Sequence, residues 1–265
     1  MTPDAALTEV ALLAPDEPPP VEAVNPEGAG EVFLICEHAG RRIPRALGAL
    51  GLGEPDLSRH IAWDIGAREV SVALSERLDA ALWMQRYSRL VCDCNRRPDV
   101  AAFAPEVSEA TAIPGNAGLT EAERARRAAA VFHPFHDAVT AALDARREAG
   151  RPTVLVSIHS FTPVFLGVAR PWEIGVLYNR DRALAPALVA WFRANSGLCL
   201  GVNEPYSVGD DTDYAIPVHG ERQDLPCVEF EIRNDLIAGR VDEWADLIAR
   251  ALRETIPGVS MGSGS

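Results

Sequence analysis

Residues 31–44 read EVFLICEHAGRRIP, an apolar run that stops abruptly at an acid, a histidine and a glycine. The run 32–35 has the β-favouring composition of a strand that is buried on both faces. Ligands in open α/β sheets bind at the carboxyl ends of strands, and His38 would lie at such an end. Because imidazole coordinates metals when neutral and titrates near neutral pH, His38 is a candidate metal ligand or acid/base. A structural, hydrogen-bonded histidine is the alternative at this point.

The same arrangement recurs at residues 153–160, TVLVSIHS, where a second apolar strand delivers His159 near its carboxyl end. Further strands are expected at 82–95, 174–178, 198–202 and 228–233, and helices at 56–82, 120–148, 181–196 and 241–255. Strands that alternate with helices at this spacing predict a single-domain, three-layer α/β/α sandwich with a mixed, largely parallel sheet.

The two ends of the chain differ in composition from its middle. Residues 1–30 are rich in Pro, Glu and Ala, and 257–265 end in Gly and Ser, so we expect a flexible N-terminal arm and a flexible tail. We therefore expect residues 31–256 to form a single folded domain. With 265 residues and 48% apolar content, the chain is long enough to bury one large core.

Composition excludes several classes of partner. A net charge of −13 argues against nucleic acid, which is bound through Lys and Arg, and all 25 basic residues here are Arg. The sequence contains no run long and apolar enough for a transmembrane helix, and its first residues do not resemble a signal peptide. Five scattered cysteines suit reduced thiols, so we expect a cytoplasmic protein without a membrane partner, and leave a homo-oligomer open.

The two strand-end histidines suggest a catalytic metal site. Catalytic zinc typically takes three protein ligands from His and Asp/Glu and leaves the fourth position to water or substrate. No HxxE or HExxH motif is present at either histidine, so the third ligand must come from elsewhere. We choose Asp64, near the start of a predicted helix. A helix N-cap is the alternative role for this residue.

Glu231 is the candidate general base. It interrupts an apolar strand, where an unpaired carboxylate is costly and its pKa rises toward the range that suits proton transfer. Glu229 and Arg233 share its face of the strand, so a strand-face salt bridge is the alternative. His219, in a Gly- and Asp-rich loop, is a candidate oxyanion stabiliser or a structural loop residue. His60, His133 and His136 are interpreted as packing or surface residues.

Arginines 89, 96 and 233 are candidates for bidentate recognition of a substrate carboxylate, because a guanidinium matches carboxylate geometry. In a chain this rich in arginine, most such residues serve solubility, so the neighbouring sequence has to single out the functional ones. For Arg96 that context is the preceding Asn95.

Taken in order, the motifs resemble those of the N-formylglutamate amidohydrolase (N-formylglutamate deformylase) family. The matching pieces cover most of the chain: Glu37-His38-Ala39-Gly40 with Pro44, Ala62-Trp63-Asp64-Ile65-Gly66-Ala67, residues 87–96 (YSRLVCDCNR), Ser157-Ile158-His159-Ser160, His219-Gly220-Glu221 and residues 229–235 (EFEIRND). Each piece is short and weak alone. The ordered set is specific.

The resemblance implies a fold related to zinc carboxypeptidases and aspartoacylases, and metal-dependent hydrolysis of an N-acyl amino acid. In those relatives an Asn-Arg pair holds the substrate carboxylate or polarises its carbonyl, and Asn95-Arg96 is similar to that pair. The glutamate of the late strand acts as general base, which corresponds to Glu231 better than to Glu229. The expected reaction uses one zinc ion on His38, His159 and Asp64, with Arg96 or His219 stabilising the oxyanion.

Two other functional classes compete with this hypothesis. A metal-free serine hydrolase would need a nucleophile elbow, and the sequence contains no G-x-S-x-G. A non-catalytic domain that binds a carboxylate metabolite at a decayed metal site is the second alternative. Stoichiometric metal in the purified protein separates the hydrolase from the binding domain.

Overall fold

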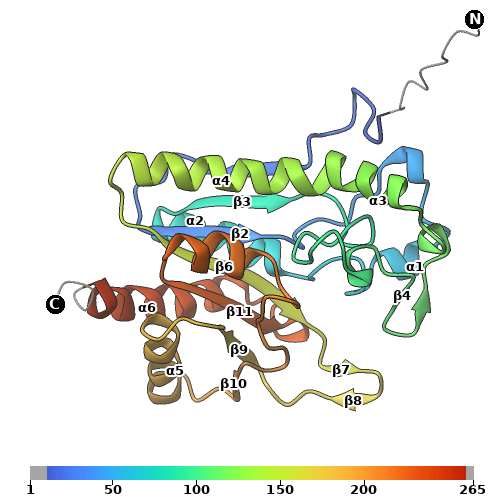
Figure 1. Cartoon of the computed structure of the whole chain (residues 1–265). Coiled ribbons are helices and arrows are strands. Elements are labelled where there is room, and N and C mark those ends of the chain that lie inside the picture. The colour runs from blue at the N-terminus through green and yellow to red at the C-terminus, as the bar shows by residue number, and fades with distance from the viewer. Residues whose placement is uncertain (1–10, 261–265) are drawn as a thin grey trace, which may run out of the picture.

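A computed structural model describes the chain from residue 11 to residue 260 (Figure 1). Its centre is a seven-stranded sheet in the order β1–β3–β2–β6–β11–β9–β10. The strands are β1 (Val21–Val24), β2 (Val32–Cys36), β3 (Ala81–Gln85), β6 (Val154–Phe161), β9 (Ile174–Leu177), β10 (Leu200–Val202) and β11 (Cys227–Arg233). The four central strands are parallel, whereas β1 and β9 run antiparallel to β3 and β11. The predicted mixed, largely parallel sheet is confirmed.

Helices cover both faces of the sheet. One face packs against α2 (Ala67–Leu78), α5 (Leu184–Asn195) and α6 (Val241–Ser260). The other packs against α4 (His133–Glu148), preceded by α3 (Glu121–Arg127). In Figure 1, α4 runs along the top of the view, and α6 and α5 lie lower, at the left. A short helix, α1 (Glu54–Leu57), lies in the connection between β2 and α2.

Side chains alternate between the two faces of the sheet along each strand, and this alternation places the polar residues of β6 and β11 on one face. On β11, Val228, Phe230 and Ile232 face the core under α2, α5 and α6. The intervening residues face the α4 side, where Cys227 is apolar but Glu229 and Glu231 are buried acids. The same face of β6 carries Leu155, Ser157 and His159. The core on the α4 side therefore becomes polar toward the carboxyl ends of β6 and β11.

Two small hairpins stand apart from the main sheet. They are formed by β4 (Val107–Ser108) with β5 (Thr111–Ala112) and by β7 (Val164–Phe165) with β8 (Val168–Ala169). The backbone N–H of Leu166 in one hairpin turn donates to Glu109 Oε1 in the other, at 3.3 Å. Residues of both hairpins line the same pocket at the carboxyl edge of the sheet.

The chain ends are more structured than their composition predicts. Within the expected arm, Val21–Val24 form edge strand β1, and Leu12 is buried in the core on the α4 side. Antiparallel pairing with β3 therefore outweighs the disfavouring proline run just before it. At the other end, α6 continues to Ser260, through residues that we assigned to the tail. Residues 1–10 and 261–265 of the arm and tail lie outside the described residues.

Three predicted elements are divided or shortened. The strand expected at 82–95 ends at Gln85, because the backbone N–H groups of Ser88 and Asp93 donate to loop carbonyls instead of a neighbouring strand. The helix expected at 56–82 is replaced by α1 and α2. The helix expected at 120–148 begins with the predicted Thr120–Glu123 capping box, but a wider π-type turn at Ala128–Phe132 separates α3 from α4.

Candidate metal centre and its pocket

Three elements deliver the expected metal ligands to one point. His38 follows β2 directly, His159 lies in β6, and Asp64 sits just before α2. The loops are tied together, since the backbone N–H of Asp64 donates to the carbonyl of His38 at 3.0 Å. All three side chains are buried. The parallel neighbours β2 and β6 bring the two histidines together because their carboxyl ends meet at one sheet edge.

Two glycines of the sequence motifs make these loops possible. A Cβ on Gly40, two residues after His38, would lie 2.1 Å from the carbonyl oxygen of Arg86. Gly66, two residues after Asp64, has a φ of +86°, and a Cβ there would lie 2.6 Å from Ile237. Only glycine allows these backbone approaches without displacing a neighbour.

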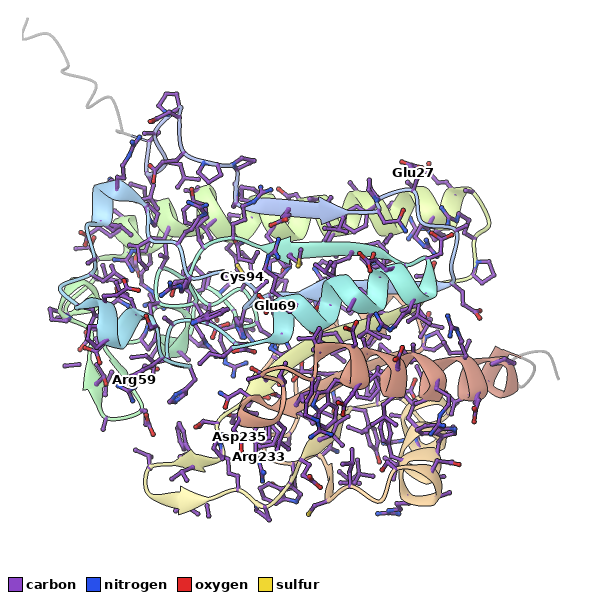
Figure 2. The ribbon with its side chains drawn as sticks, turned by 180° about the vertical axis from the view of Figure 1, so that it is seen from behind. Glu27, Arg59, Glu69, Cys94, Arg233 and Asp235 are labelled. Carbon is purple, nitrogen blue, oxygen red and sulfur yellow. The ribbon has the colours of Figure 1, made fainter. Side chains whose placement is uncertain are left out.

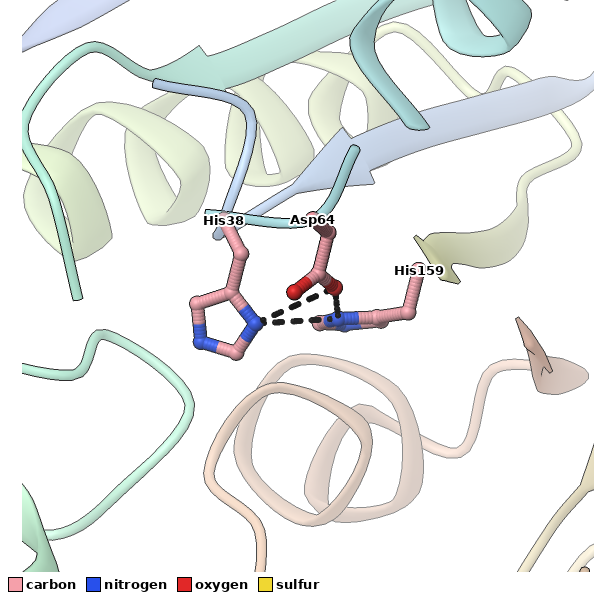
Figure 3. Close-up of side chains that lie close together, drawn as sticks. All are labelled: His38, Asp64 and His159. Carbon is pink, nitrogen blue, oxygen red and sulfur yellow. Dashed lines mark hydrogen bonds and ion pairs between the residues drawn. The ribbon is translucent and has the colours of Figure 1, made fainter. Parts of the chain in front are cut away.

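Figure 3 shows the three candidate ligands pointing toward one another. His38 Nδ1 lies 3.1 Å from His159 Nδ1 and 3.4 Å from Asp64 Oδ2, and His159 Nδ1 lies 2.8 Å from the same oxygen. Ligand atoms about 2.0–2.1 Å from a tetrahedral zinc are separated by about 3.3 Å. The observed spacing is therefore close to that of three ligands around one small cation.

The outer nitrogens of both imidazoles face carboxylates. His38 Nε2 donates to Asp93 Oδ1 at 2.7 Å, and His159 Nε2 lies 3.2 Å from Glu37 Oε2. Glu37 also accepts a hydrogen bond from the Ser157 hydroxyl at 2.8 Å. Asp93 accepts the Nε2 proton of His38, and the Glu37 carboxylate favours a proton on the Nε2 of His159, which leaves each Nδ1 free to bind a cation through its lone pair. Carboxylates behind metal-binding histidines fix the ring orientation and tautomer in this way.

This arrangement leaves two lone pairs and a carboxylate oxygen facing one another in a buried site, which requires positive charge between them. When no metal ion is bound, a proton on His159 supplies this positive charge. Burial alone would lower the pKa of His159, but the carboxylates of Glu229, Glu37 and Asp64 raise it well above its ordinary value. A divalent cation satisfies all three atoms at once. The His38–Asp64–His159 group thus fits a metal ion in both donor type and spacing.

Glu231 lies next to this group. Its partner across the parallel ladder is His159, and its Oε2 is buried without a hydrogen-bond partner. Burial and the neighbouring carboxylates of Asp64 and Glu229 raise the pKa of Glu231 well above its ordinary value. For Glu229, burial and the carboxylates of Asp213 and Glu37 raise the pKa to about 7. An acid with a raised pKa and an unused oxygen in a pocket can carry a proton.

Three of the residues that we expected to bind substrate line the pocket: Arg89, Asn95 and Arg96. The Asn95 side chain is used by the protein, since its oxygen accepts from the backbone N–H groups of Tyr214 and Ala215, both at 3.0 Å. Arg89 donates to Asp93 at 2.7 Å. Arg96 pairs with Asp213 at 3.3 Å.

Two expected site residues do not line the pocket. His219 is buried behind it, with Nε2 2.8 Å from His136 Nδ1, and burial lowers its pKa to about 4. Arg233 donates to Asp235 at 2.9 Å and to the carbonyl of Arg170, and Figure 2 shows Arg233 beside Asp235. The expected oxyanion role of His219 and the expected substrate contact of Arg233 are therefore not supported by their positions.

The pocket encloses a cavity of about 270 Å³. Several residues that sequence reasoning left out line it or support it: Glu37, His60, Asp93, Phe165, Tyr206 and Asp213. Glu37 and Asp93 had a local signal, because each is an acid inside a motif that carries a candidate ligand or substrate-binding residue. His60, which we set aside as a packing residue, had none.

Comparisons with known proteins agree with this α/β fold. Residues 30–238 match the family model of N-formylglutamate amidohydrolase. Among solved structures, gene product Atu2144 from Agrobacterium tumefaciens is 41% identical, with a TM-score of 0.91 over 94% of this chain and 99% of that one. The N-formylglutamate amidohydrolase from Ralstonia eutropha JMP134 is 18% identical, with a TM-score of 0.66 over 91% and 99%, and supports the fold. No curated protein matches the chain.

The family model covers well over half of the sequence. The chain belongs to the N-formylglutamate amidohydrolase family. This membership makes it an amidohydrolase, and a small-molecule substrate is consistent with that class. Between residues 11 and 260, no helix has the length and hydropathy needed to cross a membrane.

Proposed function

We propose that the protein is a zinc-dependent amidohydrolase that removes the N-formyl, or another N-acyl, group from an acylated amino acid such as N-formylglutamate. Family membership supports the amide substrate. The observation that carries the metal dependence is the buried meeting of two imidazole lone pairs and one carboxylate oxygen at His38, His159 and Asp64.

In this proposal the three side chains hold zinc, while Asp93 and Glu37 fix the two rings from behind. A zinc ion there would polarise the scissile carbonyl and lower the pKa of a bound water toward neutrality. The donor set does not by itself distinguish zinc from other divalent metals, so the physiological metal is part of the proposal.

Glu231 is the general base and later the general acid. Its Oε2 takes a proton from water as the water oxygen attacks the acyl carbon, and returns that proton to the amine nitrogen as the C–N bond breaks. The products are a free amino acid and a carboxylic acid, formate for a formyl group. Arg96 faces the same cavity and supports the developing oxyanion or the substrate carboxylate.

In this scheme Arg89 is a second arginine that contacts the α-carboxylate of the substrate, and Asp93 and Asp64 orient its guanidinium. Asn95 acts by holding residues 214 and 215 in place. A domain that only binds carboxylates would need a decayed metal site, and the intact ligand set speaks against that alternative. The five unpaired cysteines fit the cytoplasmic location that we propose.

The test is metal content together with turnover of N-formyl-L-glutamate. Purified protein should hold about one zinc per chain. His159→Ala should lose both metal and activity, whereas His133→Ala, at an exposed position on α4, should keep both.

Glu231→Gln separates the base from the metal. It should retain the zinc and lose about 10²–10⁴-fold in kcat, the range for a general acid–base group. Full activity in Glu231→Gln would remove this residue from the role of base. A wild-type protein that takes up no metal when zinc is supplied would overturn the mechanism.

A further inference from the structure

Arg170 is a buried arginine without an acidic partner. It follows β8, its exposed fraction is 9%, and no carboxylate among the described residues pairs with it. By contrast, Arg89 and Arg96, the arginines that line the pocket, pair with protein carboxylates. A buried charge is costly unless an opposite charge compensates it, so an uncompensated guanidinium at the edge of a pocket suggests an anionic ligand.

The surroundings of Arg170 belong to the pocket wall. Its guanidinium carbon lies 4.5 Å from the ring centre of Phe165, 4.8 Å from that of Tyr206 and 5.9 Å from that of Phe161. All three rings line the cavity that contains the candidate metal ligands. Cation–π contacts partly offset the desolvation of Arg170, but they supply no negative charge.

The hydrogen bond between Arg170 and Tyr206 determines which proton of this pocket wall is available to a ligand. Arg170 Nη1 donates to the Tyr206 hydroxyl at 2.9 Å. Because arginine can only donate, Tyr206 is the acceptor and its own proton remains available to another acceptor. Burial of the hydroxyl and the nearby Glu231 carboxylate raise the pKa of Tyr206, so this proton is retained at neutral pH.

We propose that Arg170 and Tyr206 form a second anion-binding subsite, which receives the side-chain carboxylate of a dicarboxylic N-acyl amino acid. The inference rests on the proposed function and assigns the specificity-determining residues of the same pocket. Arg96 then holds the α-carboxylate, while Tyr206 donates its hydroxyl proton to the side-chain carboxylate and Arg170 supplies the opposite charge. Phe161 and Phe165 provide apolar surface for the methylene groups between the two carboxylates.

The experiment compares three substrates that differ only in the side chain: N-formyl-L-glutamate, N-formyl-L-glutamine and N-formyl-L-leucine. Glutamine has the size of glutamate without its charge, and leucine tests the aromatic wall as an apolar pocket. We expect kcat/KM for the glutamate substrate to exceed that for the glutamine substrate by about tenfold or more, mainly through KM.

Two variants assign the preference to the subsite. Tyr206→Phe keeps the ring and removes the hydroxyl, and Arg170→Gln removes the charge. Each should reduce the glutamate-over-glutamine ratio toward one, because kcat/KM falls more for the glutamate substrate than for the glutamine substrate. Arg193→Gln, an exposed arginine on α5, is the matched control and should keep the wild-type ratio. If Arg170→Gln fails to fold, the wild-type ratio and Tyr206→Phe decide the question.

The outcomes separate this inference from the proposed function. Equal hydrolysis of the glutamate and glutamine substrates, or a preference for leucine, would overturn the subsite and leave the amidohydrolase intact. A glutamate-over-glutamine ratio that stays at the wild-type value in Tyr206→Phe would also overturn the subsite. If none of the three is hydrolysed, calorimetric binding to the metal-loaded protein decides: tighter binding of N-formylglutamate that is lost in Tyr206→Phe supports the subsite, and equal or absent binding overturns it.

Discussion

The protein buries two pairs of histidines with opposite properties. In the first, His38 Nδ1 and His159 Nδ1 lie 3.1 Å apart; in the second, His136 Nδ1 and His219 Nε2 lie 2.8 Å apart. Carboxylates surround the first pair and raise the pKa of His159. Burial lowers the pKa of His136 to about 3 and that of His219 to about 4.

The difference follows from what lies behind each ring. His136 Nε2 donates to the carbonyl of Cys94 at 2.8 Å, so His136 Nδ1 is an acceptor and His219 Nε2–H donates to it. The second pair is therefore held as two neutral rings, with His219 Nδ1 left without a hydrogen-bond partner among the described residues. In the first pair both outer nitrogens face carboxylates and both inner nitrogens face one carboxylate oxygen, so a proton or a metal ion has to lie between them. The distance between two imidazoles therefore says little about their function until the outer partners are known.

The largest effect should come from Asp64→Asn, which removes the carboxylate from the first pair. The N-cap of α2 is Gly66, and the Asp64 carboxylate accepts from the backbone N–H of Ser160, so the start of the helix does not depend on this side chain. As a metal ligand, Asp64 is needed to hold the cation, and we expect loss of most bound zinc and a fall in kcat/KM of about 10³-fold or more. Elemental analysis and N-formylglutamate turnover measure both.

The matched variant in the second pair is His219→Gln, whose side-chain amide can still donate to His136. It should keep its metal and most of its activity. Normal zinc content in Asp64→Asn would mean that the third ligand lies elsewhere. Loss of metal in His219→Gln would mean that the two pairs act as one site.

A smaller effect is expected from Asp93→Asn, which keeps an acceptor for His38 Nε2 but removes the negative charge behind it. Loss of such a partner typically lowers metal affinity about 10–100-fold. Competition with a chromophoric chelator measures this affinity, and Asp144→Asn on α4 is the control. An unchanged affinity in Asp93→Asn would reduce the role of Asp93 to holding Arg89.

The smallest effect is the pH dependence of stability that the second pair creates. Unfolded histidine binds a proton below about pH 6.5, whereas folded His136 and His219 stay neutral down to about pH 3 and 4. The unfolded state therefore binds more protons in this window, and the free energy of unfolding falls as pH falls. Each histidine contributes up to about 1.4 kcal/mol per pH unit.

Urea unfolding of the metal-free protein at pH 7 and pH 5 tests this. The wild type should lose about 2 kcal/mol more than His219→Gln between these two values. His159 contributes with the opposite sign, because its raised pKa stabilises the fold below pH 6.5 and this stability is lost as pH rises; it is present in both proteins and cancels in the comparison. Parallel pH profiles would show that His219 is not buried as a neutral ring.

Local patterns predicted the central part of the fold and the candidate metal site. The apolar runs before His38 and His159 predicted two buried strands, and β2 and β6 are adjacent and parallel. The spacing of Glu229 and Glu231 placed both on one face of a strand, and both are buried there. These predictions succeeded because strand period and burial are local properties of the sequence.

Long-range contacts account for the elements and the side-chain partners that local patterns did not predict. The segment that carries Asp93 alternates like a strand, yet its N–H groups pair with loops, and this turns the carboxylate toward His38, 55 residues away. His219 resembled an active-site loop residue, but α4 supplies His136 as its partner, 83 residues distant. Val21–Val24 were hidden by the proline run and became an edge strand because β3 offered a free edge.

The sequence by itself determined the buried strands that precede His38 and His159, the family, and the residue types of the three candidate donors, His38, Asp64 and His159. The tertiary structure alone decided which nitrogen of each ring faces the common point, which carboxylates stand behind the rings, and that Arg170 meets Tyr206 without an acidic partner. The physical reason is that residue type and strand period are encoded locally. The protonation and orientation of a buried polar group depend on partners that only folding brings within hydrogen-bond distance.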